Sequence, residues 1–285
     1  MKQVTVISGK GGTGKTTIAA AFASLAENPV LADCDCDAPD LQLLLDPTIR
    51  NQEEYVGSAT AIRSRSCSMC GRCQEVCRFN AIDEQYSITE AKCEGCGACV
   101  YACPEDAIEL RDETTGTVYE SRTRFGPMVH AELEIGEEAT GKMVTEVRRK
   151  AQAIAGNNDV VIVDGSPGIG CPVIASIKGV DHVLVVAEPT VSGMHDLKRV
   201  LEVTDQFDID TSVCVNKADI NPGKAEEILE YCRSKDVSVR GQLPYDDVAT
   251  EAMIEERTVL EHSDSELSSE IRSIWHQIEA AASVV

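Results

Sequence analysis

Residues 9–16 read Gly9-Lys10-Gly11-Gly12-Thr13-Gly14-Lys15-Thr16, a glycine-rich stretch that fits the pattern G-x4-G-K-[ST]. An apolar segment, 4–7, precedes it and predicts a strand, and the alanine-rich segment 15–26 predicts a helix. In this setting the glycines let backbone N–H groups surround phosphate oxygens, and the helix N-terminus adds a favourable dipole. The stretch therefore predicts a nucleotide-binding loop, and a glycine-rich turn without a ligand is the less favoured interpretation.

The polar residues of this loop have predicted roles. Lys15 is expected to reach the β- and γ-phosphates, and the Thr16 hydroxyl is expected to coordinate magnesium. The residues of the loop expected to contact the nucleotide are Gly9, Gly11, Gly12, Thr13, Gly14, Lys15, Thr16 and Thr17.

Predicted strands and helices alternate along the rest of the chain. Further strands are expected at 30–33, 160–163, 183–187, 213–216 and 237–241. Further helices are expected at 141–155, 193–206, 223–234, 247–257 and 265–281. The strands are rich in valine and do not alternate strictly, which is typical of a parallel sheet covered on both faces. The predicted fold class is therefore α/β, with a doubly wound, mostly parallel sheet.

Eight of the 13 cysteines lie within residues 67–103, in two runs with the same C-x2-C-x2-C-x3-C spacing. The first run is Cys67, Cys70, Cys73 and Cys77, and the second is Cys93, Cys96, Cys99 and Cys103. Each cysteine of the second run follows its counterpart by 26 residues, which indicates a duplicated unit. The spacing is that of two-cluster ferredoxins, in which the fourth cysteine of each run ligates the other run's cluster. We therefore expect one 4Fe–4S cluster on the first three cysteines plus Cys103, and another on Cys93, Cys96, Cys99 and Cys77.

Two other uses of these cysteines fit the sequence less well. A disulfide framework requires an oxidising compartment, and the sequence begins Met1-Lys2-Gln3-Val4 without a signal peptide. Zinc sites usually take two C-x2-C pairs rather than two runs of four. Arg78 stands where a proline often follows the fourth cysteine, and its charge is expected to raise a cluster's potential.

Several motifs resemble those of one ATPase family. Lys10, directly after the first glycine, resembles the deviant Walker A signature of the MinD/Mrp/ParA and nitrogenase iron-protein ATPases. Asp33-Cys34-Asp35-Cys36-Asp37 stands where these families carry switch I, and Asp164-Gly165-Ser166-Pro167-Gly168 resembles Walker B with switch II. Asn216-Lys217-Ala218-Asp219 and Leu243-Pro244-Tyr245-Asp246 follow in the order of the nucleotide-base loops. With these motifs and the two cysteine runs, the chain resembles MinD-superfamily ATPases that contain an inserted ferredoxin domain.

The resemblance implies a role for each of these residues. Lys10 would cross a dimer interface to the partner's phosphates, which implies an ATP-sandwiched dimer, either of this chain or with a paralogue. The implied catalytic residues are Lys10, Lys15, Asp33 and Asp35, with Asp35 orienting the attacking water, Asp33 near the metal and Asp37 a weaker candidate. Asp164 would hold a magnesium-bound water, and the Gly168 N–H would sense the γ-phosphate. Asn216, Asp219 and Pro244 would recognise the base, and Asp219 leaves GTP as an alternative to ATP.

These expectations define the domains and the function. The P-loop ATPase domain is predicted at 1–58 and 141–285, a small α+β bacterial-type ferredoxin domain at 59–112, and a linking hairpin at 113–140. The predicted function is that of an ATPase, with ATP/ADP, Mg²⁺ and two 4Fe–4S clusters, that couples nucleotide state to electron transfer to a redox partner protein. The alternatives are a carrier or assembly factor for iron–sulfur or heterometal cofactors, and a redox-sensing positioning or regulatory ATPase.

Composition narrows the partners and the location. With 26 basic and 48 acidic residues the net charge is −22, which disfavours nucleic acid and anionic lipid as partners. No apolar run approaches the roughly 20 residues that span a bilayer, so a cytoplasmic protein without a membrane segment is expected.

The remaining apolar and cysteine residues have ordinary expected roles. Ile271, Ile274, Trp275 and Ile278 form a helical stripe expected to pack in the core. Cys214 and Cys232 are expected to be buried, and Cys34 and Cys36 are weak candidates for redox sensors. Cys171 is expected at a dimer interface, with an intersubunit cluster as the less favoured alternative.

Overall fold

The computed structural model describes residues 2–156 and 160–282. Met1 and Val285, the outer limits of the predicted domains, lie outside these ranges. The chain divides into two units, and the first comprises Met1–Glu53, Val118–Leu133 and Glu138–Val285. The second comprises Glu54–Thr117 and Glu134–Glu137, and it contains both cysteine runs.

A parallel sheet forms the centre of the first unit. Its strands are β1 (Lys2–Ser8), β2 (Pro29–Asp33), β5 (Pro127–Leu133), β6 (Val160–Pro167), β7 (His182–Ala187), β8 (Thr211–Val215) and β9 (Ser238–Gln242). They lie in the order β5-β2-β6-β1-β7-β8-β9, and each neighbouring pair is parallel. Every residue of β2 and β7 is buried, which explains why these strands read as unbroken apolar runs.

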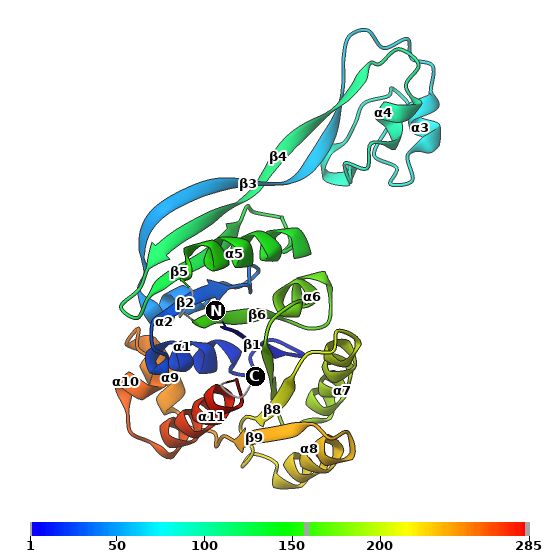
Figure 1. Ribbon diagram of the computed structural model, residues 1–285. Coiled ribbons are helices and arrows are strands. Elements are labelled where there is room, and N and C mark those ends of the chain that lie inside the picture. Colours follow the sequence, from blue (N-terminus) through cyan, green and yellow to red (C-terminus); the bar gives the residue numbers. More distant parts are fainter. Residues whose placement is uncertain (1, 157–159, 283–285) are drawn as a thin grey trace. The chain divides into compact units, whose positions relative to one another are not determined.

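Helices cover both faces of this sheet (Figure 1). The first layer contains α1 (Lys15–Leu25), α2 (Leu41–Leu45), α9 (Val248–Ile254), α10 (Val259–His262) and α11 (Glu266–Ala282). The second layer contains α5 (Gly141–Ile154), α6 (Cys171–Ile177), α7 (Val191–Gln206) and α8 (Pro222–Ser234). The predicted doubly wound α/β fold is therefore confirmed.

The apolar stripe of α11 packs into the first layer. Ile271, Ile274 and Ile278 are at most 1% exposed, and the Trp275 ring lies 4.9 Å from that of Phe22, between centroids. The prediction that this stripe belongs to the core is confirmed. Within residues 2–156 and 160–282, none of the helices combines the length and the apolar character that a bilayer crossing requires.

Two strands extend the sheet where the sequence predicted a link. Across residues 2–156 and 160–282 the sheet has nine strands, because β3 (Thr48–Arg63) and β4 (Ile108–Arg122) continue it beyond β5 in the order β3-β4-β5. A tight turn joins β4 to β5, in which the Thr123 N–H donates to the Gly126 carbonyl over 2.9 Å. The linking hairpin was predicted at 113–140; the structure has β4 and β5 in this part of the chain, and β5 also pairs with β2 as part of the nucleotide-binding sheet.

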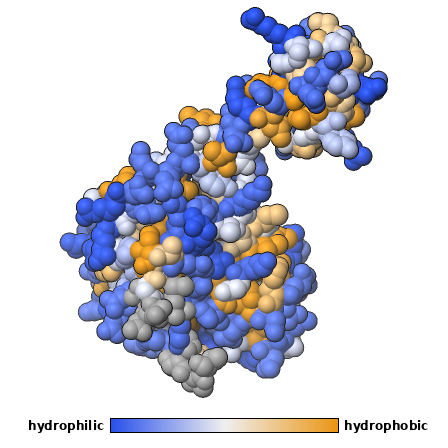
Figure 2. All heavy atoms as spheres, turned by 45° about the horizontal axis from the view of Figure 1, so that its top comes forward, coloured by the Kyte–Doolittle hydropathy of each residue, from blue (hydrophilic) through white to orange (hydrophobic). Residues whose placement is uncertain are grey.

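The second unit repeats one small motif. Its helices are α3 (Arg72–Val76) and α4 (Ala98–Ala102), with a short 3₁₀ helix, η1 (Glu90–Lys92), between them. Each helix follows a left-handed glycine, Gly71 or Gly97, so the repeat in sequence is also a repeat in structure. A core of Cys73, Cys99 and three aliphatic residues forms its centre. The face of the molecule in Figure 2 is mostly hydrophilic, with apolar residues in separate patches, as the high charge implies.

Candidate nucleotide site and cysteine cavity

The phosphate-binding loop lies between β1 and α1 and is held by the loop that follows β8. Gly14 has φ 93°, and a Cβ there would lie 2.5 Å from the Asn216 Nδ2 atom, so only glycine fits. Asn216 Nδ2 donates to the Thr13 carbonyl over 2.8 Å, and Lys217 Nζ donates to the Gly12 carbonyl over 3.2 Å. Two residues of the predicted base loop therefore support the phosphate loop directly.

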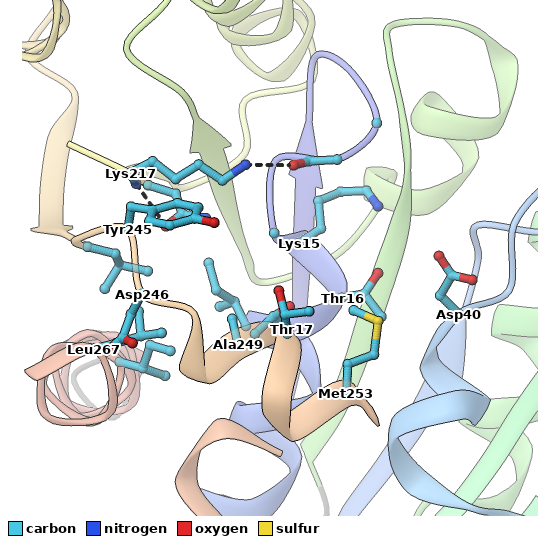
Figure 3. Close-up of a pocket in the computed structure, with 18 of the residues that line it drawn as sticks. Lys15, Thr16, Thr17, Asp40, Lys217, Tyr245, Asp246, Ala249, Met253 and Leu267 are labelled. Carbon is cyan, nitrogen blue, oxygen red and sulfur yellow. Dashed lines mark hydrogen bonds between the residues drawn. The ribbon is translucent and has the colours of Figure 1, made fainter. Parts of the chain in front are cut away.

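A cavity of about 450 Å³ opens beside this loop. Its polar wall contains Lys15 and Thr16 from α1, and its other walls contain Tyr245 and the apolar side of α9, including Met253 (Figure 3). The predicted residues that line it are Gly11, Gly12, Gly14, Lys15, Thr16, Thr17, Asp35, Asp37, Asn216 and Pro244. Its size is within the range of small-ligand sites.

Lys15 is neutralised by carboxylates of its own chain. Its Nζ atom lies 3.1 Å from Asp35 Oδ2 and 3.8 Å from Asp164 Oδ1, and the lysine side chain is only 6% exposed. Burial alone would lower the pKa of Lys15, but the charges of Asp164 and Asp35 raise it above its ordinary value. A phosphate that binds Lys15 must therefore displace or join the Asp35 carboxylate.

Asp33, the last residue of β2, pairs in register with Asp164 inside β6, and both are fully buried. Asp33 accepts hydrogen bonds from the backbone N–H groups of Asp35 and Leu41, each over 3.1 Å, so it shapes the switch I loop. Neither oxygen of Asp164 accepts a hydrogen bond in the described structure, although the nearby Thr16 hydroxyl favours its charged form. Burial raises the pKa of both carboxyls, and the charge of Asp164 raises that of Asp33 further. A divalent cation beside Asp164 and Thr16 would provide the missing partner, so these residues fit a magnesium site.

The switch II residues are engaged within the chain. The Gly168 N–H donates to the Ser8 carbonyl over 2.8 Å, and Ser166 Oγ donates to the Cys34 carbonyl over 2.5 Å. The Gly168 N–H must leave this bond before it can meet a phosphate. Asp37, the weaker candidate of switch I, is exposed, lines the same cavity and accepts the Ala139 N–H over 2.9 Å.

Lys10 also makes contacts within its own chain. Its Nζ atom lies 3.0 Å from Glu188 Oε2, and Lys217 Nζ lies 2.6 Å from the other oxygen of Glu188. Burial opposes ionisation of Glu188, but hydrogen bonds from Lys217 and Lys10 hold its pKa below the ordinary value. Glu188 was not predicted from the sequence, where its one local signal is its position directly after β7, at the carboxyl edge of the sheet.

Asp219 supports the second base loop. Its Oδ1 atom accepts the backbone N–H of Tyr245 over 2.6 Å, next to Pro244 in the cavity wall. The Tyr245 hydroxyl in turn donates to Asp247 over 2.9 Å. The structure therefore gives Asp219 a backbone partner and gives Tyr245 a role that the sequence analysis did not assign.

A second, small cavity lies in the cysteine-rich unit. It is lined by Cys93, Cys96 and Cys99 of the second run and by Cys77 of the first. Several cysteine sulfurs accept backbone hydrogen bonds, including Cys93 from the Ala61 N–H over 3.4 Å. All eight cysteines are free thiols. Across the described residues, no three His, Cys, Asp or Glu side chains converge closely enough to hold a single metal ion.

The remaining cysteines lie in the first unit. Cys214 and Cys232 are buried, as predicted. Cys34 and Cys36 are buried as well, and burial raises the pKa of both thiols, which disfavours the reactive thiolate. Cys171 is exposed at the first residue of α6.

Comparison with known proteins agrees with this geometry. Over 280 residues the chain is 33% identical to an uncharacterized protein of Methanocaldococcus jannaschii, MJ0578, covering 97% of this chain and 96% of that protein. A second uncharacterized protein of that organism, MJ0579, is 28% identical over 269 residues, covering 93% of each.

Solved structures show the same fold. The septum site-determining protein MinD of Pyrococcus horikoshii, complexed with Mg-ADP, aligns with a TM-score of 0.62 at 16% identity, covering 99% of this chain and 98% of that chain. The McdA(D38A)–ATP complex of Cyanothece aligns with a TM-score of 0.59 at 14% identity, covering 98% of this chain and 96% of that chain. Residues 4–259 match the CobQ/CobB/MinD/ParA nucleotide binding domain. The chain therefore belongs to the CobQ/CobB/MinD/ParA nucleotide-binding family and has a MinD-like P-loop fold.

Proposed function

We propose that this chain is an ATP-hydrolysing iron–sulfur protein that couples its nucleotide state to electron transfer to a partner protein. The observation that carries the proposal is the lining of the second cavity, where Cys77 of the first run joins three cysteines of the second. This combination matches the crossed ligand sets of two-cluster ferredoxins, which the spacing predicts. Its presence in a member of a nucleotide-binding family connects the two chemistries in one chain.

The cysteine residues fit two 4Fe–4S clusters. Cys77, Cys93, Cys96 and Cys99 would hold one cluster, and Cys67, Cys70, Cys73 and Cys103 the other. A cluster bonds each cysteine to a different iron, so its sulfurs stand further apart than the ligands of one ion, and the lack of a single-ion group does not oppose this assignment. When bound, such clusters supply one-electron transfer. The protein supplies the N–H donors that stabilise the sulfurs, such as Ala107 to Cys103 over 3.3 Å.

The nucleotide site supports hydrolysis by in-line water attack. Lys15 is already placed at the phosphate loop, and its release from Asp35 would free that carboxylate to orient the water. Asp164 and Thr16 would hold Mg²⁺, which neutralises phosphate charge. Asp33 is better suited to a positioning role, because two backbone N–H groups already occupy its oxygens. ATP is favoured over GTP, because the Tyr245 N–H already engages the Asp219 carboxylate that a guanine would need.

We further propose that nucleotide binding dimerises the protein through Lys10. To reach a partner's phosphates, the lysine must exchange its contact with Glu188 for one across the interface. The partner is a second copy or a paralogue, and one organism, M. jannaschii, holds two relatives of this chain. A positioning or regulatory ATPase whose clusters sense redox state is the second candidate, because the family includes MinD and ParA.

Anaerobic purification with iron and sulfide analysis tests the iron–sulfur part of the proposal. We expect about eight irons per chain, as two 4Fe–4S clusters require. Cys99→Ser should lose iron, whereas Cys171→Ser, the matched control with an exposed cysteine outside both runs, should retain it. Wild-type protein without iron would overturn this part of the proposal, as would a Cys99→Ser variant that keeps its full iron content.

The ATPase part is tested separately on the same preparation. We expect Mg-dependent ATP hydrolysis that Lys15→Ala abolishes while leaving the iron content unchanged. Activity that survives this change would contradict the assigned phosphate site. To separate the two candidates, reduced protein is mixed with an oxidised acceptor such as a low-potential viologen. ATP-dependent oxidation of the clusters favours electron transfer, and ATP-independent oxidation favours a sensor.

A further inference from the structure

The guanidinium of Arg63 contacts a ligand sulfur of the first cysteine run, whereas Arg78 makes no such contact in the described structure. Arg63 Nη1 lies 4.0 Å from Cys67 Sγ and donates to the Gln85 carbonyl over 3.3 Å. The carbonyl contact fixes the partly buried arginine beside the first cysteine of the first run. Because the repeat has an offset of 26 residues, the counterpart of Arg63 is Thr89, which carries no charge.

Backbone N–H groups donate to sulfurs in both predicted ligand sets. Cys67 Sγ also accepts the Met69 N–H over 3.4 Å, and Cys103 Sγ accepts the Ala107 N–H over 3.3 Å. Both cysteines belong to the same predicted ligand set. In the other set, the Ala61 N–H donates to Cys93 over 3.4 Å, and a backbone hydrogen bond from Val100 favours the charged form of Cys99, as one from Gln74 does for Cys73 of the first set. Both sets therefore receive backbone hydrogen bonds, and the difference between them is the cationic donor of the first set.

Charge and hydrogen bonds at the sulfurs are the levers that set the potential of an iron–sulfur cluster. Reduction adds a negative charge, which a nearby cation and additional N–H donors stabilise. We propose that Arg63 holds the two clusters at unequal potentials, so that an electron entering this unit occupies the cluster of Cys67, Cys70, Cys73 and Cys103. This inference rests on the proposed function, because it requires both clusters to be present.

The test is an anaerobic redox titration of the full chain, followed by EPR, of the wild type, Arg63→Gln and Arg65→Gln. Arg65 is the matched control, because it lies in the same segment but is exposed and makes no such contact in the described structure. We expect two distinct midpoint potentials in the wild type. Arg63→Gln should lower the higher midpoint potential by ~59 mV, which is a tenfold change in the equilibrium constant of a one-electron couple, and should leave the lower midpoint potential unchanged. Arg65→Gln should leave both unchanged.

A lysine variant and the iron content distinguish a wrong role for Arg63 from the absence of the clusters. Arg63→Lys keeps the charge and should restore most of the potential that glutamine loses. If Arg63→Gln lowers neither midpoint, lowers both equally, or acts no more strongly than Arg65→Gln, the role of Arg63 is refuted while the clusters stand. A wild-type protein without iron overturns the proposed function and this inference together.

Discussion

Replacing Asp164 with asparagine is expected to stabilise the protein without nucleotide and to abolish its stabilisation by magnesium nucleotide. Asp164 is fully buried, and neither of its oxygens accepts a hydrogen bond in the described structure. The equally buried Asp33 is its neighbour in strand register and repels its charge. The positive charge of Lys15 offsets this repulsion only in part, because Lys15 Nζ lies 3.8 Å from Asp164 Oδ1 but 3.1 Å from Asp35 Oδ2.

The size of the effect follows from these contacts. Asparagine removes the buried charge of Asp164 and its repulsion of Asp33, whereas its own amide is also unpaired there and the Lys15 contact is lost, so we expect a net gain of about 1 kcal/mol for Asp164→Asn. For a unit of this size that corresponds to a melting temperature higher by about 2–4 °C. Mg-ATP at 100 times its Kd should stabilise the wild type by ~2.7 kcal/mol and the variant by much less.

Thermal unfolding with and without Mg-ATP measures both effects. Asp40→Asn is the control, because Asp40 is an exposed carboxylate that lines the same cavity. We expect it to melt like the wild type without nucleotide. The reasoning is refuted if Asp164→Asn melts below the wild type without nucleotide, or if Mg-ATP stabilises the two proteins equally.

Three further experiments concern the pH dependence of Asp164→Asn, the glycines of the second unit and the loop that contains Asp219. Since burial raises the pKa of Asp164, the native state retains its proton to higher pH than the unfolded state. The stability advantage of Asp164→Asn in urea unfolding should therefore grow as the pH rises above the ordinary aspartate value of about 3.9, and an advantage that shrinks over this rise would contradict the pKa direction. Gly95→Ala would place a Cβ 2.2 Å from a backbone carbonyl oxygen, whereas at Gly97 the nearest atom is a leucine methyl carbon at 3.8 Å. Limited proteolysis should therefore cleave the second unit much faster in Gly95→Ala than in Gly97→Ala, where the left-handed backbone costs only about 1–2 kcal/mol. Asp219→Ala should weaken ATP binding about fivefold, measured by calorimetry, because the Tyr245 N–H loses its acceptor. Asp219→Asn keeps an acceptor and should retain most of the affinity, and equal losses in the two variants would indicate that the charge matters more than the hydrogen bond.

The nucleotide-binding half of the fold was readable from the sequence because each element carries its own local signal. Residues 9–16 define a loop that only one strand–loop–helix geometry satisfies, and strands such as β7 are buried along their whole length. β3 gave no such signal, because most of its residues are polar and exposed. β5 was assigned to a hairpin alone, because its pairing with β2 joins residues about a hundred positions apart, and no local pattern encodes that pairing.

The site shows the same division between local and long-range information. Lys15, Asp35 and Asp164 could be predicted because each lies in a recognisable motif, in or after a buried strand. Glu188 could not, because its importance comes from two lysines that reach it from distant loops. The spacing of the cysteines predicts which of them share a ligand set, but the guanidinium beside Cys67 becomes visible only when the chain folds.

The coupling of nucleotide state to the clusters is the central claim, and a redox titration tests it most directly. The cluster potentials are measured by EPR in anaerobic protein, with and without a non-hydrolysable ATP analogue and magnesium. Because binding linkage is reciprocal, coupling requires the nucleotide to bind the oxidised and reduced forms with different affinity. We predict that the analogue shifts at least one midpoint potential by about 59 mV, a tenfold change in equilibrium constant for one electron. Identical potentials in the two samples would contradict the account.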